Sequence, residues 1–262
     1  MAVKKRKTKN NKSKWWLAPV LVALLLAGYS AFMYWKQLKE EGRAKFAVYP
    51  AFGIELPLGY PIHGIDVSGY QNFIYWPSVK AMKDRDLQLR FAFIKATEGL
   101  KDVDKQFKHN WQAAKEAGMA RGAYHYFLPT KSGKQQAINF INAVKLEPGD
   151  LPPVLDIEKL YGVDPMVMRQ EINDWLQTVE AAYKVRPIIY SYSDFYNNYL
   201  GDKYLGYTLW IAHYITKDKP RIKRDWGFWQ YSESGNVNGI VGKVDFDLFA
   251  GDSLQFAGLL IK

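Results

Sequence analysis

Cysteine is absent from this 262-residue chain, which excludes a disulfide framework, a thiolate zinc site and a cysteine nucleophile. Histidine is scarce, because only four residues are present and they share no spacing typical of metal ligands. A glycine-rich phosphate loop is also missing, which argues against a nucleotide-binding protein. The sequence therefore predicts neither a metal site nor a cofactor.

Acidic residues are missing from the first fourteen positions, whereas seven of the Lys and Arg residues lie there. Without residues 1–14, the formal net charge of the chain falls from +10 to +3. The basic character is therefore a property of an N-terminal tail and not of a binding surface. Nucleic acid is not an expected partner.

Charge of either sign is missing from the next twenty-one residues, 15–35. A helix over this range is about 31 Å long, which matches the hydrocarbon core of a bilayer. Trp15 and Trp16 lie at one end and Tyr34 and Trp35 at the other, as expected for aromatic residues at the two membrane interfaces. We expect a single N-terminal transmembrane helix that acts as an uncleaved anchor.

The basic tail also predicts the orientation of this helix. The positive-inside rule favours a cytoplasmic N-terminus and a domain on the outer side of the cytoplasmic membrane, in the periplasm or cell wall. A cleaved signal peptide is the alternative, but the apolar run is long for one and no clear cleavage site follows it. Residues 36–61 begin helix-like and become rich in Pro and Gly, so we expect them to form a stalk.

From residue 62 onward, apolar runs alternate with amphipathic ones. Eight runs read as strands, at 62–68, 89–97, 122–127, 152–157, 186–192, 207–214, 227–232 and 243–249. Helices are expected at 76–86, at 104–118, from Ser132 onward and at 165–184, the last capped by Asp164.

Repeated strand–helix units predict a parallel sheet covered by helices, and eight strands suggest closure into a barrel. The connections 193–206 and 215–226 have little helical pattern. The expected fold class is therefore α/β, an irregular TIM-like β/α barrel with incomplete helices toward its C-terminal end. An open doubly wound sheet is the alternative.

The segment LPPVLDIE, 151–158, ends an apolar run with two carboxylates, Asp156 and Glu158. Side chains two residues apart share one side of a strand, and in a β/α barrel the carboxyl ends of the strands carry the chemistry. Asp66 and Asp245 are placed similarly on the first and last expected strands, although spacing does not separate Asp245 from Asp247. One such acid more often caps a helix or pairs with a base, but this pair favours acid–base chemistry, since crowded carboxylates raise one another's pKa.

A series of motifs makes the chain resemble a known family. In order they are HGIDVSGYQ (63–71), FAFIKATEG (91–99), a helix with Phe107 and Asn110, AGMARGAYHYF (117–127), LPPVLDIE (151–158), PIIYS (187–191), LWIAHY (209–214), WQYS (229–232) and VDFD (244–247). This series resembles glycoside hydrolase family 25, the Chalaropsis-type lysozymes or N-acetylmuramidases. The resemblance implies a catalytic barrel over residues 62–252 and a C-terminal tail over 253–262, in which no wall-binding repeat is found.

The resemblance also implies an activity, namely hydrolysis of the β-1,4 bond between N-acetylmuramic acid and N-acetylglucosamine in peptidoglycan glycan strands. It makes Glu158 the general acid and gives Asp156 the task of orienting the substrate's 2-acetamido group, in a retaining, substrate-assisted reaction. Asp66 and Asp245 would maintain the protonation and geometry of the network. A direct carboxylate nucleophile is the alternative.

Six further residues in matched motifs are candidates for substrate binding: Lys95, Tyr124, Tyr126, Tyr190, Trp210 and Gln230. Lys95 could contact a polar or anionic part of the glycan, and the others could line the groove. Each of these side chains could equally pack in the core. His125 and His213 are expected to be structural.

The predicted function is therefore that of a membrane-anchored peptidoglycan hydrolase. A glycan-binding protein without turnover is a second hypothesis, which the presence of all four acids disfavours. A barrel glycosidase acting on chitin-like polymers is a third, and comparison of chitin oligomers with peptidoglycan would separate it from the first.

Overall fold

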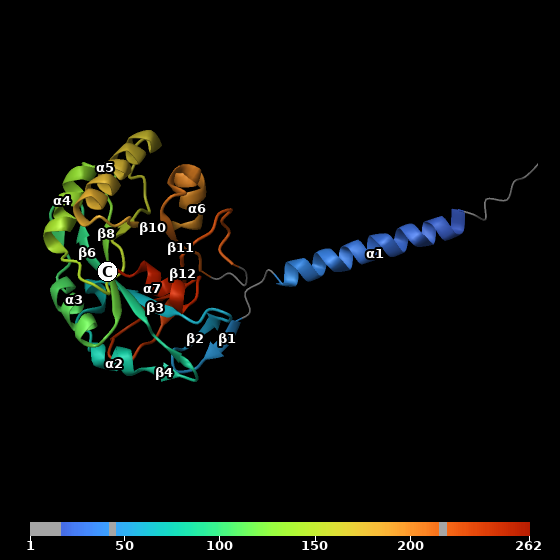
Figure 1. Cartoon of the computed structure of the whole chain (residues 1–262), viewed down its shortest axis with the longest axis horizontal. Coiled ribbons are helices and arrows are strands. Elements are labelled where there is room, and N and C mark those ends of the chain that lie inside the picture. The colour runs from blue at the N-terminus through green and yellow to red at the C-terminus, as the bar shows by residue number, and fades with distance from the viewer. Residues whose placement is uncertain (1–16, 42–45, 215–218) are drawn as a thin grey trace, which may run out of the picture. The chain divides into compact units, whose positions relative to one another are not determined.

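The computed structural model describes residues 17–41, 46–214 and 219–262, and the chain divides into two units, Met1–Arg43 and Ala44–Lys262 (Figure 1). The first unit contains helix α1 (Leu17–Glu41), in which Pro19–Gln37 is apolar enough to cross a membrane, with a mean hydropathy of 1.3. A signal sequence has the same character. The expected basic tail, 1–14, together with Trp15 and Trp16, lies outside the described residues.

The second unit is built around a closed barrel of eight strands. They are β3 (His63–Val67), β6 (Phe91–Glu98), β8 (Ala120–Tyr126), β9 (Val154–Asp156), β10 (Ile188–Tyr192), β11 (Thr208–Ala212), β12 (Phe228–Gly235) and β13 (Val244–Phe249). Neighbours follow in chain order, and β3 closes the barrel by pairing with both β6 and β13. All eight expected strands are present, and the expected irregular TIM-like barrel is confirmed.

Strand β13 differs from the expected parallel arrangement, because it runs antiparallel to both of its neighbours, β12 and β3. The other strand pairs of the barrel are parallel. The start of β13 therefore lies at the same mouth of the barrel as the carboxyl ends of the other strands. Asp245, the second residue of β13, pairs directly with Asp66 of β3.

The interior of the barrel is filled with aromatic rings. Phe93 stacks on Trp210 with ring centroids 4.2 Å apart, and Phe91 and Phe93 both meet Phe228 edge-on. Gly64 leaves room for these rings, since a Cβ atom there would lie 2.5 Å from Phe91. The packed rings fill the centre of the barrel.

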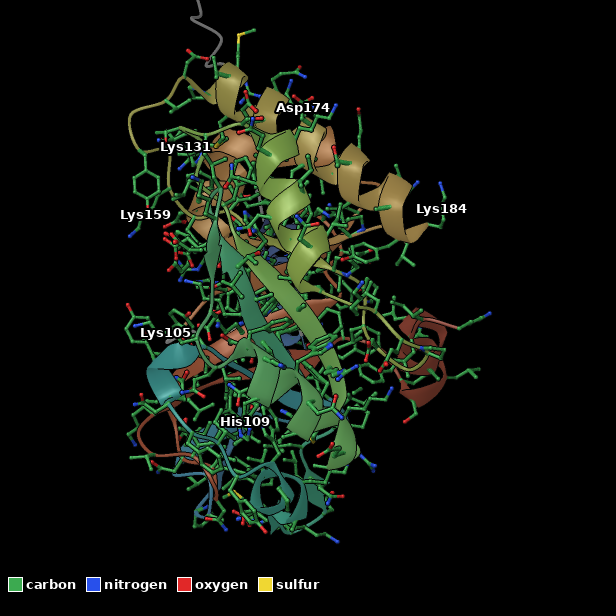
Figure 2. All side chains as sticks on the ribbon, turned by 90° about the vertical axis from the view of Figure 1, so that its left-hand side faces the viewer. Lys105, His109, Lys131, Lys159, Asp174 and Lys184 are labelled. Atoms are coloured by element: carbon green, nitrogen blue, oxygen red, sulfur yellow. The ribbon has the colours of Figure 1, made fainter. Side chains whose placement is uncertain are left out.

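Four helices cover the first half of the barrel: α2 (Trp76–Ala81), α3 (Phe107–Glu116), α4 (Gly133–Ala143) and α5 (Pro165–Tyr183). Helices α4 and α5 lie side by side over the barrel (Figure 2). Ser132 and Asp164 cap α4 and α5 as expected. Between β10 and β11 the chain forms short helical segments, α6 (Ser193–Phe195), a π-helical turn (Tyr196–Leu200) and a 3-10 turn (Gly201–Tyr204), as predicted for the C-terminal half.

Short elements complete the fold. They are the 3-10 turn η1 (Gly69–Gln71), the paired strands β4 (Lys83–Asp84) and β5 (Leu87–Gln88), β7 (Asp102–Val103) beside β6, and helix α7 (Ser253–Leu259). Helix α2 is shorter than expected because Met82 is extended and β4 follows at once. The expected C-terminal tail is folded, since Phe256 of α7 packs against Phe91 and Phe249.

Part of the expected stalk, 36–61, is also folded. Strands β1 (Phe46–Tyr49) and β2 (Ile54–Pro57) form an antiparallel hairpin, and Phe52 in its turn is fully buried. The Phe52 ring meets Phe246 of β13 edge-on, with centroids 5.3 Å apart. The stalk assignment is therefore wrong for residues 46–57, because their apolar side chains pack on the barrel.

Candidate active site

A cleft of about 460 Å³ opens at the mouth of the barrel. All ten residues proposed from the sequence line it, namely Asp66, Lys95, Tyr124, Tyr126, Asp156, Glu158, Tyr190, Trp210, Gln230 and Asp245. They come from eight different strands or strand ends, which only the closed barrel brings together. The expected convergence of the four acids is therefore present in the structure.

Asp156 and Glu158 stand at the end of β9. Strand β9 ends at Asp156, but the N–H of Ile157 still donates to the carbonyl of Tyr190 at 3.0 Å. The extended pairing therefore continues toward Glu158. Both acids consequently line the same cleft. In register, Asp156 lies between Tyr126 of β8 and Tyr190 of β10.

Asp156 is the more buried acid of the pair, with 6% of its surface exposed. Burial raises its pKa well above the ordinary range, Glu158 raises it further, and Lys95 opposes the shift. Within the described part of the chain, its Oδ1 atom has no hydrogen-bond partner. A buried acceptor without a donor lowers the stability of the free protein, and it can accept a hydrogen bond from a substrate N–H.

Burial also raises the pKa of Glu158, which is partly open to the cleft. Hydrogen bonds from Tyr192 and Tyr126 and the charges of Lys159 and Lys95 oppose this shift. Tyr126 is in turn hydrogen-bonded to Tyr161, with 3.0 Å between the hydroxyl oxygens. Glu158 is thus a carboxyl that holds its proton to a higher pH than usual, in a fixed orientation.

The facing wall holds Asp66, Asp245 and Asp247. Burial, Glu233 and Glu158 together raise the pKa of Asp245 to about 6. Asp247 lies deeper, is fully buried and accepts a 2.7 Å hydrogen bond from Nε1 of Trp210. Its Oδ2 atom has no hydrogen-bond partner among the described residues, and the Asp66 carboxyl is a close neighbour that affects its pKa. Burial raises the pKa of Asp66 well above its usual range, and the nearby charges of Asp245 and Asp247 raise it further.

Gln230 connects the two walls of the cleft. Its Oε1 accepts hydrogen bonds from Tyr190 and Tyr214, each at 2.6 Å, and its Nε2 donates to Asp66 at 2.5 Å. Gln230 and Trp210 are both nearly fully buried. They support the acids from behind, whereas Lys95 and Tyr126 are partly exposed to the cleft.

Several cleft residues were not predicted from the sequence. They include Tyr70, Gln71, Tyr192, Tyr214, Glu233 and Lys243. Tyr192 could have been found, because it continues the alternation of Tyr190 at the end of the same strand. Lys243 precedes Asp245 by two residues, but nothing in the sequence indicates that this loop reaches the cleft.

The histidines make internal contacts. His125 lies between Thr97 and Gln136, and burial lowers its pKa to about 3. The ring of His63 contacts the Tyr231 hydroxyl at 3.0 Å, and His213 accepts from the N–H of Arg221. Across the described ranges, no group of His, Asp and Glu has the arrangement of a metal site.

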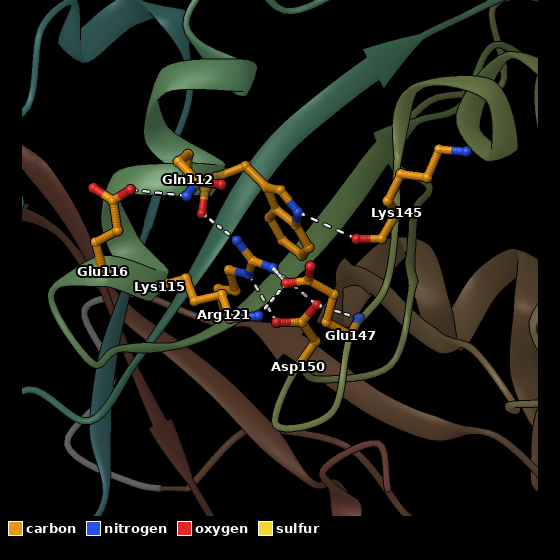
Figure 3. A network of polar contacts seen from close by, with 8 residues as sticks. Gln112, Lys115, Glu116, Arg121, Lys145, Glu147 and Asp150 are labelled. Atoms are coloured by element: carbon orange, nitrogen blue, oxygen red, sulfur yellow. Dashed lines mark hydrogen bonds and ion pairs between the residues drawn. The ribbon is translucent and has the colours of Figure 1, made fainter.

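A larger hollow of about 1130 Å³ lies beside α3 and α4, away from the acids. The buried Arg121 is one of the residues that line this hollow, and Figure 3 shows the polar contacts around it. Its guanidinium donates to both oxygens of Asp150, to Glu147 and to the carbonyl of Trp111, and it lies 4.0 Å from the Trp111 ring. These contacts join β8 to α3 and to the loop that carries Glu147 and Asp150.

Comparison with known proteins agrees with this geometry. Residues 65–240 match the family Glycosyl hydrolases family 25. The chain is 44% identical over 201 residues to the protein YegX of Escherichia coli K12, covering 77% of this chain and 74% of that protein. It is 36% identical over 218 residues to Lysozyme M1 of Streptomyces globisporus, covering 76% and 71%.

Among solved structures, a family 25 glycosyl hydrolase from Bacillus anthracis superposes with a TM-score of 0.71. It is 33% identical in sequence, and the match covers 77% of this chain and 94% of that one. The family match spans most of the barrel and includes Asp66, Asp156 and Glu158. This chain belongs to glycosyl hydrolases family 25.

Proposed function

We propose that the barrel hydrolyses the β-1,4 bond between N-acetylmuramic acid and N-acetylglucosamine in peptidoglycan. The observation that carries the proposal is the cleft itself, in which Asp156 and Glu158 face Asp66 and Asp245 at one barrel mouth. Relatives in the same family are named lysozyme and N,O-diacetylmuramidase. Membership in a glycoside hydrolase family and the four acids together support turnover over simple glycan binding.

Glu158 is the general acid in this proposal. Its raised pKa favours the protonated carboxyl, and its position open to the cleft lets it donate that proton to the glycosidic oxygen as the bond to the sugar carbon breaks. The resulting carboxylate then removes a proton from the incoming water. General acid–base catalysis of this kind contributes roughly 10²–10⁴-fold to the rate.

Asp156 acts on the substrate's 2-acetamido group. Its unpartnered Oδ1 accepts a hydrogen bond from the amide N–H, which turns the acetamido oxygen toward the anomeric carbon. This oxygen attacks the anomeric carbon on the face opposite to the leaving sugar and forms a cyclic intermediate. Water then opens the cyclic intermediate, and two inversions give net retention. The product formed first is therefore the β-anomer, which proton NMR of fresh digests measures directly.

The location of the enzyme is also a proposal. Helix α1 has a span-length apolar segment, with its described side chains exposed, and seven basic residues precede it in the sequence. We place the N-terminus in the cytoplasm, the helix in the membrane and the barrel on the outer side, where peptidoglycan is found.

The test uses the unit of residues 44–262 incubated with purified peptidoglycan. Products are reduced with borohydride and identified by mass spectrometry. Reduced muramic acid ends are expected. Reduced glucosamine ends would mean that the other glycosidic bond is cut, and release of no fragments by folded protein that binds peptidoglycan would favour a binding function.

Glu158→Gln tests the role of the acid. It keeps the shape of the side chain but removes the transferable proton, so kcat should fall by about 10²-fold or more. Glu55→Gln is the matched control, because Glu55 is an exposed residue of strand β2 outside the cleft. Wild-type turnover by Glu158→Gln would contradict the assignment.

A further inference from the structure

One end of the cleft is formed by two loops that are distant in the sequence. Tyr70 and Gln71 belong to the loop after β3, and Lys243 precedes β13. All three line the cleft that contains the acids. Tyr70 is 90% exposed, so its ring is open to a ligand in the cleft.

Hydrogen bonds hold this end of the cleft in place without any ligand. The Gln71 amide donates to the backbone carbonyl of Lys243 at 3.3 Å and accepts from the N–H of Ser68. The N–H of Tyr75 donates to the carbonyl of Gly239 at 2.9 Å, which joins the same two loops a second time. The backbone segments that carry Tyr70 and Lys243 are therefore joined by the protein itself.

The charge of Lys243 is not neutralised as that of Lys95 is. Lys95, the other lysine of the cleft, forms a 2.6 Å ion pair with Glu98. The ammonium of Lys243 donates to the amide oxygen of Asn236 at 2.9 Å, and among the described residues it has no ion pair with a carboxylate. A cation is thus held at the rim of a cleft whose other charged residues are mostly acids.

We propose that Lys243 and Tyr70 form a subsite for a muramic acid unit, in which Lys243 binds a carboxylate carried by that sugar. This inference rests on the proposed function. The ammonium suits a carboxylate, while the exposed Tyr70 ring suits the apolar face of a pyranose. Peptidoglycan offers two sources of such a carboxylate. One is the lactyl group of a muramic acid that has lost its peptide, and the other is the stem peptide.

The test compares three soluble, uncross-linked glycan strands as substrates. One keeps its peptide stems, one has the stem carboxylates converted to amides, and one has had the stems removed so that lactyl carboxylates are free. Initial rates at substrate concentrations below KM are measured for wild type, Lys243→Gln and Lys243→Arg. Lys184→Gln is the control, since Lys184 is exposed at the C-terminal end of α5 (Figure 2).

Wild type should cleave at least one carboxylate-bearing substrate about three- to fivefold faster than the amidated one, the size expected for an exposed ion pair. Lys243→Gln should lose this preference, Lys243→Arg and Lys184→Gln should keep it, and added salt should weaken it. Preference for intact strands identifies the stem as the source, and preference for stripped strands identifies the lactyl group.

Equal rates of wild type on all three substrates, or a preference that survives in Lys243→Gln, would overturn the subsite. Either result would leave the proposed hydrolase function intact, because the strands would still be cleaved. Failure to cleave any strand would instead overturn the proposed function.

Discussion

Asp245 and Asp247 are two residues apart on β13, yet their surroundings differ. Asp245 lies at the mouth beside Asp66, whereas Asp247 is fully buried beneath it and bonded to Trp210. The alternating sequence places both on one face of the strand, but it does not say which end of the strand is open. The antiparallel direction of β13 decides this.

Asp247→Asn should stabilise the protein at neutral pH. Burial raises the folded-state pKa of Asp247, so this residue contributes stability below its unfolded pKa, and the contribution is lost as pH rises through the folded pKa. Asparagine does not ionise, so the variant does not lose this stability as pH rises, and its amide oxygen can still accept the hydrogen bond from Trp210. Urea unfolding should show a larger free energy of unfolding for the variant than for wild type. This difference should grow as pH rises above the unfolded pKa, by at most about 1.4 kcal/mol per pH unit.

The same measurement near pH 3 should show no comparable gain, because the carboxyl is then protonated in both states. Asp86→Asn, at an exposed position, controls for loss of a negative charge. Destabilisation of equal size at both pH values would show that Asp247 matters through its hydrogen bonds alone.

Tyr192→Phe should move the basic limb of the pH–activity profile to higher pH. The Tyr192 hydrogen bond lowers the pKa of Glu158, so its removal lets that pKa rise. A general acid works only while protonated, and activity is lost as pH rises through its pKa. The kcat/KM profile on soluble strands measures the shift, and exposed Tyr75→Phe is the control. An unchanged limb, or one moved to lower pH, would contradict the role of Glu158 as the titrating acid.

At the scale of elements, the hairpin of β1 and β2 supports the strand that carries Asp245 and Asp247. Phe52 is fully buried against Phe246 of β13. Phe52→Ala should lower the free energy of unfolding by about 3–5 kcal/mol, the usual cost of removing a buried aromatic ring. Chemical denaturation of residues 44–262 measures it. Val48→Ala on the same hairpin is the control, because Val48 is 55% exposed. Similar small effects of both changes would mean that the hairpin is not part of the cooperative unit.

The strands of the barrel could be predicted because each apolar run is bounded by turns and helical patterns. The direction of β13 was missed, although a signal was present. Only residues 236–243 separate β12 from β13, which is too short for the crossover that parallel strands need. The β1–β2 hairpin was missed because Pro50, Gly53 and Pro57 suggested a linker, and only the packing of Phe52 shows otherwise.

The acids of the site were predictable from their positions after apolar strands, since strand ends meet at a barrel mouth. The residues that hold these acids in place were harder to predict. Gln230 joins Tyr190, Tyr214 and Asp66, which are more than fifteen residues away from it or on other strands, and this network depends on closure of the barrel. Lys243 lies in the cleft on a loop that hydrogen bonds join to the loop after β3.

At the scale of the whole molecule, the apolar segment of α1 and the catalytic barrel belong to separate units. The segment Pro19–Gln37 has nineteen residues, so as a helix it is about 28 Å long, close to the thickness of a hydrocarbon core. Its exposed side chains include Leu24 and Leu25. A helix with this much exposed apolar surface agrees with the proposed membrane span.

The full-length protein should therefore remain with membranes after washing with high salt and alkaline carbonate, whereas residues 44–262 should be released. Leu25→Arg should weaken retention, because a charge near the centre of a span costs about 2.5–3.5 kcal/mol. Leu254→Arg is the matched control, since Leu254 is 83% exposed on helix α7 of the other unit.

Protease added outside the cytoplasmic membrane should digest the barrel and spare an N-terminal epitope. A shortened protein in the soluble fraction, with its new N-terminus after the apolar run, would mean instead that the segment is a cleaved signal and that the barrel acts free of the membrane.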